Sequence, residues 1–399
     1  MASDIIGFVP PRYGSEVVGG AEAVMAEAAH GLAKRGHKVE IITTCAIDHY
    51  TWRNEYSPGL DMSGEVPVRR FKVDNDSSGV ARKNIGDRIL SGGYVPVEDQ
   101  QLWANDSLRS STMWHHLSEN MDNYRCLIFA PYQFWTAYAC GQIDPSKTIV
   151  MPCLHEEPEA RFDIYQPLLN GAKGIWFLTD PEAWLANEIF NLTKSQDIVG
   201  AAVDVPPGYD PQGFIEKFGI DSPFIYYAGR REWGKGWQDL LAGFAGALDS
   251  TDIKLVTSGV GELGLTEELK KRVIDVGFTS DTDRNNAMAA ALAYVQPSDR
   301  ESFSRTVLES WLAGTPVIAN ARSAVVAWHI ERSKAGYAYN GVENLTDAIV
   351  GFANNPAAAQ DLAKTGRDYV LSNYQWSDIL DNMEASLEKL FPSQEPRSI

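Results

Sequence analysis

Residues 294–319 read YVQPSDRESFSRTVLESWLAGTPVIA, and this stretch decides the fold of the chain. Its apolar start predicts a strand that ends at Pro297, and 304–313 has the apolar spacing that is typical of a helix. Gly314 ends that helix, and a second apolar run follows at 317–319. Strand, polar loop, helix and strand in this order predict a βαβ unit of a parallel sheet.

The rest of the chain repeats this alternation in two successive halves. Apolar runs predict strands at 5–9, 39–43, 66–73, 126–130, 148–153, 174–178 and 197–205, and then at 224–228, 254–257 and 273–277. Helical patterns lie between them, at 21–35, 98–120, 181–191, 237–248 and 283–292. The least regular part is 74–121, where we expect a loop before the helix.

A cluster of proline and glycine at 206–213 predicts a linker between the halves. The fold class is therefore α/β, with two Rossmann-like doubly wound domains that face a central cleft. We expect the first domain at 1–207 and the second at 208–375. The C-terminal segment 376–399 begins with an amphipathic helix, which we expect to pack back on the first domain.

The composition is that of an acidic globular protein. The 399 residues are 44% apolar and 22% charged, and the net charge of −18 argues against a nucleic-acid-binding protein. The longest apolar runs are strand-sized, which predicts no transmembrane helix. No basic segment precedes the first strand, so we expect no secretion signal and a cytoplasmic location. The four cysteines form no C-x-x-C pair, which favours reduced thiols over disulfides or a zinc site.

Charged residues follow two predicted strands of the second half. The loop 229–236 reads GRREWGKG and carries Arg230 and Lys235, whose donors suit phosphate oxygens. Glu301 lies in the polar loop of the stretch quoted above, and Glu309 lies in its helix. Ligands of open parallel sheets bind beyond the carboxyl ends of strands, so these residues predict a site for phosphates flanked by hydroxyl-bearing groups, as in a nucleotide sugar. The alternatives are a solvated basic turn, a helix-capping carboxylate and a surface glutamate.

Four segments together resemble the retaining glycosyltransferases of family 4, which have the GT-B fold. The segments are VGGAE at 18–22, Gly229-Arg230 with Lys235-Gly236, Ser298 with Glu301-x7-Glu309, and AGTPV at 313–317. They are spread over nearly the whole chain. The resemblance implies a GT-B fold and the transfer of a hexose from a nucleotide diphosphate sugar, either a UDP- or a GDP-sugar, to a hydroxyl acceptor.

The resemblance also places a donor site on the residues that match the family's motifs. In this family, the backbone of a loop in the first domain and two cations of the second domain contact the donor phosphates. The resemblance implies these roles for Gly19 and Gly20 and for Arg230 and Lys235. One glutamate of the family lies beside the donor sugar, which implies that role for Glu301. A second glutamate binds the ribose hydroxyls, which implies that role for Glu309. The backbone after the first glutamate approaches the sugar and the phosphate in this family. The resemblance implies such contacts for Ser302, Phe303, Ser304 and Arg305.

A histidine after a middle strand of the first domain lies near the reacting carbon in this family, which implies that role for His155. The implied catalytic residues are therefore His155, Arg230, Lys235 and Glu301. The alternative for His155 is a surface histidine paired with the acidic turn at 156–159. The family often has glycines where this chain has Ser302 and Ser304, and a β-carbon there changes how closely the backbone meets the sugar.

We expect the first domain, with the segment 74–121, to shape the acceptor site. Its candidate walls are Tyr94, Trp103 and Trp114. We expect no cofactor and no catalytic metal. Two pairs match a D-x-D pattern, but Asp74 with Asp76 looks like a loop, and Asp281 or Asp283 looks like a helix N-cap.

By resemblance the reaction retains the anomeric configuration, and the departing phosphate acts as the base. The acceptor is a saccharide, a glycolipid or a small molecule, and no nucleic acid is expected as a partner. Two alternatives stay open. One is a nucleotide-sugar epimerase or hydrolase on the same fold, and the other is a non-catalytic nucleotide-sugar-binding protein.

Overall fold

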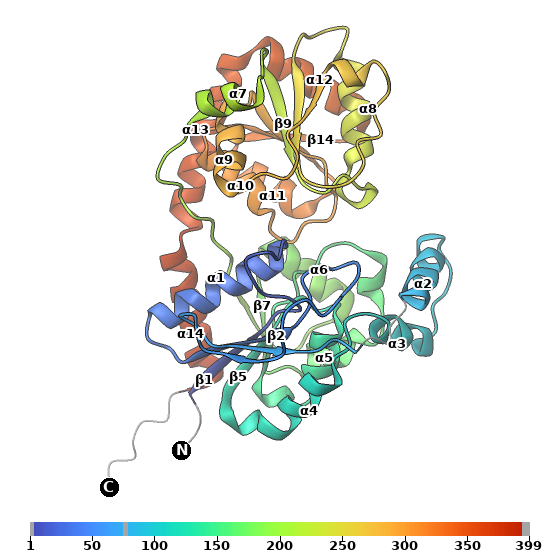
Figure 1. Ribbon diagram of the computed structural model, residues 1–399, viewed down its shortest axis with the longest axis vertical. Helices are drawn as coiled ribbons and strands as arrows, with labels where there is room; N and C mark the ends of the chain where they lie inside the picture. The colour runs from blue at the N-terminus through green and yellow to red at the C-terminus, as the bar shows by residue number, and fades with distance from the viewer. Residues whose placement is uncertain (1–3, 75–78, 393–399) are drawn as a thin grey trace. The chain divides into compact units, whose positions relative to one another are not determined.

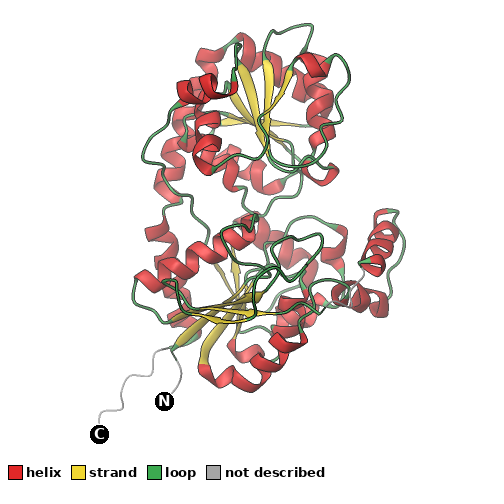
Figure 2. Ribbon diagram, in the orientation of Figure 1, coloured by secondary structure: helices red, strands yellow, loops and turns green. Residues whose placement is uncertain are grey.

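The computed structural model describes residues 4–74 and 79–392. The chain forms two compact units, one made of Met1–Ala201 with Trp376–Ile399 and the other of Ala202–Gln375. In each unit the strands lie at the centre and helices cover the sheet (Figure 1). Figure 2 shows the same layering by secondary structure. The two sheets confirm the predicted α/β fold class with two Rossmann-like domains, while the acceptor and donor roles of the units stay predictions.

The first unit holds an eight-stranded sheet. In spatial order its strands are β3 (Gly59–Asp61), β4 (Val68–Phe71), β2 (Val39–Thr44), β1 (Ile5–Val9), β5 (Tyr124–Phe129), β6 (Thr148–Val150), β7 (Gly174–Phe177) and β8 (Ser195–Ile198). All neighbours are parallel except β3 and β4. The chain moves outward from β1 in one direction and from β5 in the other, so the two halves of the sheet diverge between these strands.

The helices of this unit come from both ends of the chain. They are α1 (Gly20–Lys34), α2 (Val80–Leu90), α3 (Val97–Asn105), α4 (Ser111–Asn120), α5 (Tyr165–Gly171), α6 (Asp180–Phe190) and α14 (Trp376–Leu390). The C-terminal helix α14 is packed into the unit, because the indole of Trp176 donates to the hydroxyl of Ser386 over 2.8 Å. Leu380 of the same helix lies against Gly31 of α1.

The second unit holds a six-stranded parallel sheet. Its spatial order is β11 (Val273–Asp275), β10 (Lys254–Ser258), β9 (Phe224–Ala228), β12 (Ala293–Gln296), β13 (Val317–Asn320) and β14 (Gly336–Tyr339). The helices are α7 (Pro211–Phe218), α8 (Trp237–Ala247), α9 (Asp281–Ala290), α10 (Arg305–Leu312), α11 (Ala324–Ser333), α12 (Gly341–Asn354) and α13 (Pro356–Asn373). The βαβ unit predicted over 294–319 is confirmed, with Tyr294 of β12 level with Val317 of β13.

Some predicted elements differ in extent from those of the structure. The helix expected at 98–120 is two helices, because Ser110 leaves the helical path and caps α4. The helix α2 was not expected, and its start is held by Asp106, whose carboxylate accepts the N–H groups of Gly79 and Arg82. The strand expected at 197–205 ends at Ile198, and α7 begins inside the linker expected at 206–213.

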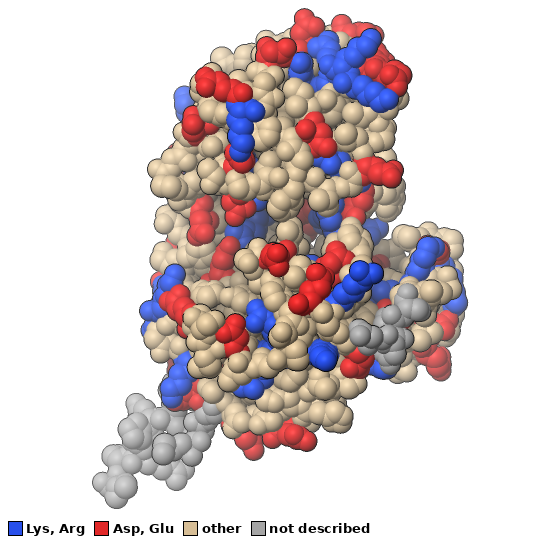
Figure 3. Space-filling view, in the orientation of Figure 1, with Lys and Arg blue, Asp and Glu red and all other residues tan. Residues whose placement is uncertain are grey.

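The distribution of charged side chains and the state of the cysteines match what the composition predicts. Acidic and basic side chains are interspersed over the visible face of both units (Figure 3). All four cysteines are free and buried, as predicted. Among the described residues, no helix has both the length and the apolar character that are needed to cross a membrane.

Candidate active site

The sheet of the second unit changes direction between β9 and β12. From β9 the chain moves outward to β10 and β11, and from β12 it moves the other way to β13 and β14. The two strands are parallel neighbours, with Tyr226 level with Tyr294, so the loops after them leave from the same edge. Those loops are 229–236 and 297–304. Open α/β sheets bind ligands at this kind of switch point.

An ion pair joins the two loops. The ammonium of Lys235 lies 2.8 Å from a carboxylate oxygen of Glu301, and both side chains are partly buried. Arg230 lies in the same loop as Lys235, and its guanidinium contacts Glu232 at 3.1 Å. The structure therefore brings three of the predicted donor residues to one edge of one sheet.

The backbones of the two loops also touch. Gly236 has a left-handed φ of 70°, and a β-carbon there would lie 2.3 Å from the carbonyl oxygen of Pro297. That carbonyl accepts the side-chain amide of Asn320 over 3.0 Å. On the other loop, the hydroxyl of Tyr227 donates to the carbonyl of Arg230 over 2.6 Å. Each loop is thus held by a hydrogen bond from a side chain of the sheet, Tyr227 of β9 or Asn320 of β13.

The start of α10 carries a serine in an unusual conformation. Ser304 precedes the helix with φ 65° and ψ 66°, a left-handed backbone that costs a residue with a β-carbon about 1–3 kcal/mol. The buried amide of Gln296 donates to its hydroxyl over 2.9 Å and to Thr306 over 3.2 Å. Gln296, which sequence reasoning missed, therefore holds the conformation that glycine adopts without strain. The side chain of Phe303 is buried beside His329.

Glu309 is held by arginines. Its carboxylate lies 3.2 Å from the guanidinium of Arg284 on α9 and 4.0 Å from Arg305, one helical turn away. It is nearly buried, with 11% of its side chain exposed. Glu309 is thus paired with cations of the helices rather than with those of the 229–236 loop. Sequence reasoning missed Arg284, because its helix is distant in the chain and no pattern links the two.

In the first unit, Gly19 and Gly20 lie at the start of α1, just after the loop that follows β1. A buried ion pair fixes this loop, in which Nε of Arg12 donates to Glu22 over 2.9 Å. A second guanidinium nitrogen donates to the carbonyl of Ile47 over 2.8 Å. The predicted contact of the two glycines with donor phosphates stays a prediction.

His155 follows β6 and lies beside a buried carboxylate. Its Nδ1 is 3.5 Å from Glu157, whose other oxygen accepts the hydroxyl of Tyr132 over 2.7 Å. Burial holds the pKa of Tyr132 well above its ordinary value, so the hydroxyl keeps the proton that it donates. The simple alternative, a surface histidine on an acidic turn, accounts for the contact but not for the burial of Glu157. Nothing in the sequence pointed to Tyr132, which follows a different strand.

A second buried carboxylate ties the loop before His155 to the next strand. Glu182 accepts the N–H of Leu154 over 2.8 Å and that of Leu178 over 2.6 Å. Burial raises the pKa of Glu182 from 4.5 to about 8. Because the folded-state pKa is raised, its stabilising contribution is fully present below about pH 4.5 and is lost as the pH rises through about 8.

This pKa gives a test by denaturation. Between pH 5 and pH 9, we expect the free energy of unfolding of the full chain to fall more steeply with pH than that of Glu182→Gln, by on the order of a few kcal/mol. Urea unfolding of both proteins at several pH values measures the difference. Parallel pH dependences would contradict the protonated state of Glu182.

The three predicted acceptor walls differ in exposure. Tyr94 is 80% exposed and Trp114 is 39% exposed, whereas Trp103 is only 7% exposed. The guanidinium of Arg82 covers the ring of Trp103 at 3.9 Å, and Phe162 packs against its edge. Trp103 is therefore a core side chain of the α2–α3 region, which corrects the prediction that its ring forms an acceptor wall.

The two D-x-D pairs serve local structure where they are described. Asp74 accepts the backbone N–H and the hydroxyl of Ser111, and Asp76 lies outside the described residues. The N-cap of α9 is Ser280, so the prediction of an aspartate cap is wrong, and Asp281 and Asp283 lie in the first turn. Within 4–74 and 79–392, no group of His, Cys, Asp and Glu is arranged to hold a metal ion. Metal independence stays a prediction.

Several solved structures superimpose on nearly the whole of this chain, and some of them are named as glycosyltransferases. Sucrose-phosphate synthase from Thermosynechococcus elongatus superimposes with a TM-score of 0.71, at 17% identity, over 97% of this chain and 99% of that chain. HepE from Anabaena, solved with UDP and glucose, superimposes with a TM-score of 0.70, at 14% identity, over 96% and 99%. At these identities the likeness establishes the fold, which is the GT-B fold.

The sequence of the second unit carries a family signature. Residues 212–369, which lie within this unit, match the family model described as Glycosyl transferases group 1. Glycogen synthase from Mycobacterium tuberculosis is 27% identical over 39% of this chain and 40% of its own length. The 2-deoxystreptamine glucosyltransferase from Streptomyces kanamyceticus is 29% identical over 38% and 43%. The chain thus matches less than half the length of these curated relatives.

Proposed function

We propose that this chain is a retaining glycosyltransferase of the family-4 type. It would transfer a hexose from a UDP- or GDP-sugar to a hydroxyl of a saccharide, a glycolipid or a small molecule. The observation that carries the proposal is the ion pair between Lys235 and Glu301, which joins two loops at the switch point of the second sheet. A cation for the leaving diphosphate and a carboxylate for the sugar thereby share one edge.

The charges suit the chemistry of the transfer. When a glycosyl–phosphate bond breaks, negative charge grows on the diphosphate and positive charge grows on the sugar. In the proposed mechanism, Arg230 and Lys235 stabilise the diphosphate, and Glu301 lies beside the sugar. Glu309 binds the ribose hydroxyls through the carboxylate that Arg284 orients. The departing phosphate takes the acceptor proton, and His155 lies near the reacting carbon, so no side-chain nucleophile, cofactor or metal is required.

The relatives support this reaction type. Their names describe a glycogen synthase, a glucosyltransferase and, in Agrobacterium fabrum, a mannosylfructose-phosphate synthase. HepE was also solved with UDP-glucose, which makes UDP-sugars the first donors to test. Cytoplasmic residence is part of the proposal and rests on the sequence alone.

Thermal shift with UDP, GDP and ADP tests the donor site. We expect one of the three to raise the melting temperature, because a ligand at a hundred times its Kd stabilises the folded chain by about 2.7 kcal/mol. The control is Glu309→Gln, whose lost ribose contact should reduce that shift. An equal absence of shift for all three nucleotides would contradict the proposal.

Product analysis with the donor alone separates the transferase from its alternatives. We expect little conversion of the matching nucleotide sugar without an acceptor, and rapid release of the nucleoside diphosphate when an acceptor is added. Rapid conversion without an acceptor would favour the epimerase or hydrolase. Donor binding without turnover across an acceptor panel would favour the non-catalytic binding protein.

A further inference from the structure

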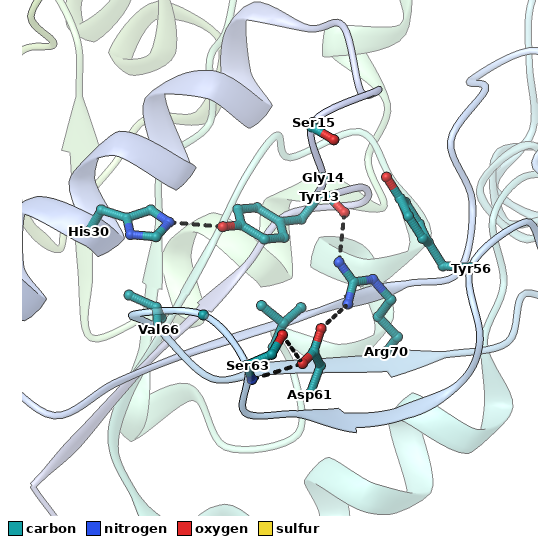
Figure 4. Close-up of a pocket in the computed structure, with 11 residues that line it drawn as sticks. Tyr13, Gly14, Ser15, His30, Tyr56, Asp61, Ser63, Val66 and Arg70 are labelled. Atoms are coloured by element: carbon teal, nitrogen blue, oxygen red, sulfur yellow. Dashed lines mark hydrogen bonds and ion pairs between the residues drawn. The ribbon is translucent and has the colours of Figure 1, made fainter.

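The first unit contains a hollow that the donor site does not use. Its volume is about 490 Å³, within the range of about 300–1,000 Å³ that is typical of small-molecule sites. Its walls come from the loop after β1, from α1, and from the β3–β4 pair (Figure 4). The loop that supplies Tyr13 and Ser15 to the hollow continues along the chain to Gly19 and Gly20.

Arg70 lines the hollow (Figure 4). Its guanidinium lies 4.6 Å from the centre of the Tyr56 ring, and Nη2 donates to the carbonyl of Tyr13 over 3.3 Å. Nη1 is 3.8 Å from Asp61, which neutralises the charge without a hydrogen bond. A guanidinium has five N–H donors, and in the described part of the chain only the one toward Tyr13 meets an acceptor.

Two hydroxyls at the hollow are also uncommitted. Among residues 4–74 and 79–392, the hydroxyls of Tyr56 and Ser15 have no hydrogen-bond partner. Both residues line the hollow (Figure 4). Val66 and Val68, whose side chains are mostly buried, add apolar carbon to the lining of the hollow. The hydroxyls can form hydrogen bonds with the hydroxyl groups of a ligand. The aromatic ring and the apolar carbon can pack against its C–H groups, so the hollow suits a ligand that carries both.

The charges of the hollow favour an uncharged ligand. Arg70 is balanced by Asp61, and the nearby carboxylate of Glu65 lies 3.6 Å from His30. Among the described residues that line the hollow, no positive charge is therefore left over for a phosphate or a carboxylate. We propose that this hollow binds a neutral saccharide and that this saccharide is the acceptor. The acceptor role of the saccharide rests on the proposed function, whereas the binding of a saccharide in the hollow does not.

The absence of a side chain at Gly14 leaves room for the Tyr56 hydroxyl. Its φ is 155°, and a β-carbon on Gly14 would lie 2.2 Å from the hydroxyl oxygen of Tyr56. The variant Gly14→Ala should therefore displace the ring and fill part of the hollow. It complements Tyr56→Phe, which removes only the hydroxyl. Tyr50→Phe is the matched control, because Tyr50 is 63% exposed and does not line the hollow.

Ligand-observed NMR titration of the full chain measures binding directly. The probes are glucose, mannose, galactose, sucrose and maltose at millimolar concentrations, with the 6-phosphates of the hexoses as the charged arm. We expect at least one neutral sugar to bind, about two- to tenfold weaker in Tyr56→Phe and about tenfold or more weaker in Gly14→Ala. Tyr50→Phe should bind like the wild type.

Three results would overturn the inference. They are the failure of every neutral probe to bind, equal binding by the wild type and Tyr56→Phe, and binding of hexose phosphates about tenfold tighter than that of neutral hexoses. A parallel thermal shift with UDP and GDP separates this failure from failure of the proposed function. Nucleotide binding by all variants without a saccharide effect rejects only the hollow, whereas saccharide binding without any nucleotide shift rejects only the donor site.

Discussion

Replacing both Arg230 and Lys235 with alanine should lower kcat by about a hundredfold to ten-thousandfold. Each cation offers a charge-assisted hydrogen bond to the leaving diphosphate, worth roughly 1.5–3 kcal/mol, and the two together amount to about 3–6 kcal/mol. Steady-state release of the nucleoside diphosphate from the matching donor measures the loss. The single variants Arg230→Ala and Lys235→Ala should each show part of it.

The same substitutions should leave the fold intact. The pair between Lys235 and Glu301 is partly exposed, and pairs of this kind stabilise proteins by about 0–1 kcal/mol. The melting temperature should therefore change little while turnover collapses. Lys271→Ala is the matched control, since Lys271 is exposed in the same unit and outside both loops. Turnover within a factor of two or so of wild type in the double variant would end the transferase assignment.

The second large effect is expected at Gly236. A β-carbon there meets the carbonyl oxygen of Pro297 at 2.3 Å, and the left-handed φ of 70° adds about 1–3 kcal/mol of strain. Gly236→Ala should push the two loops apart and separate Lys235 from Glu301. We expect a loss of stability of about 2–4 kcal/mol and a loss of the nucleotide-induced thermal shift.

Gly234 offers a control in the same loop. A β-carbon on Gly234 would meet no atom within 4 Å, so Gly234→Ala should stay within about 0.5 kcal/mol of the wild type. Urea unfolding measures both variants. If Gly234→Ala and Gly236→Ala behaved alike, the contact between the two loop backbones would not be what holds the donor site.

The regular parts of the fold were predictable because their signals are local. The strand at Phe224–Ala228 and the βαβ unit around α10 are apolar runs bounded by glycine and proline, and the structure has them where the patterns place them. The break between α3 and α4 was not predictable. It lies between Asp106, which ends α3 and accepts N–H groups at the start of α2, and Ser110, which caps α4, and no periodicity encodes these contacts.

Some residues of the candidate site could likewise be predicted from the sequence, and others could not. Arg230, Lys235 and Glu301 could be found because their loops follow predicted strands, and the order of the strands then made these loops neighbours. The partners Arg284 and Tyr132 were missed, since each reaches its glutamate from a separate element. Trp103 was misjudged, because a tryptophan in an irregular segment gives no sign of the arginine that covers it.

The return of α14 to the first unit has a consequence for biosynthesis. Leu390 lies against Gly174 of β7 and Ile379 lies against Gly200, just after β8, so the last helix completes the packing of strands made about 180–200 residues earlier. A ribosome delivers the whole of 202–375 before that helix emerges. In a nascent chain the second unit is therefore complete while the first unit still lacks α14, and the apolar side chains that α14 covers stay exposed until the last helix is made.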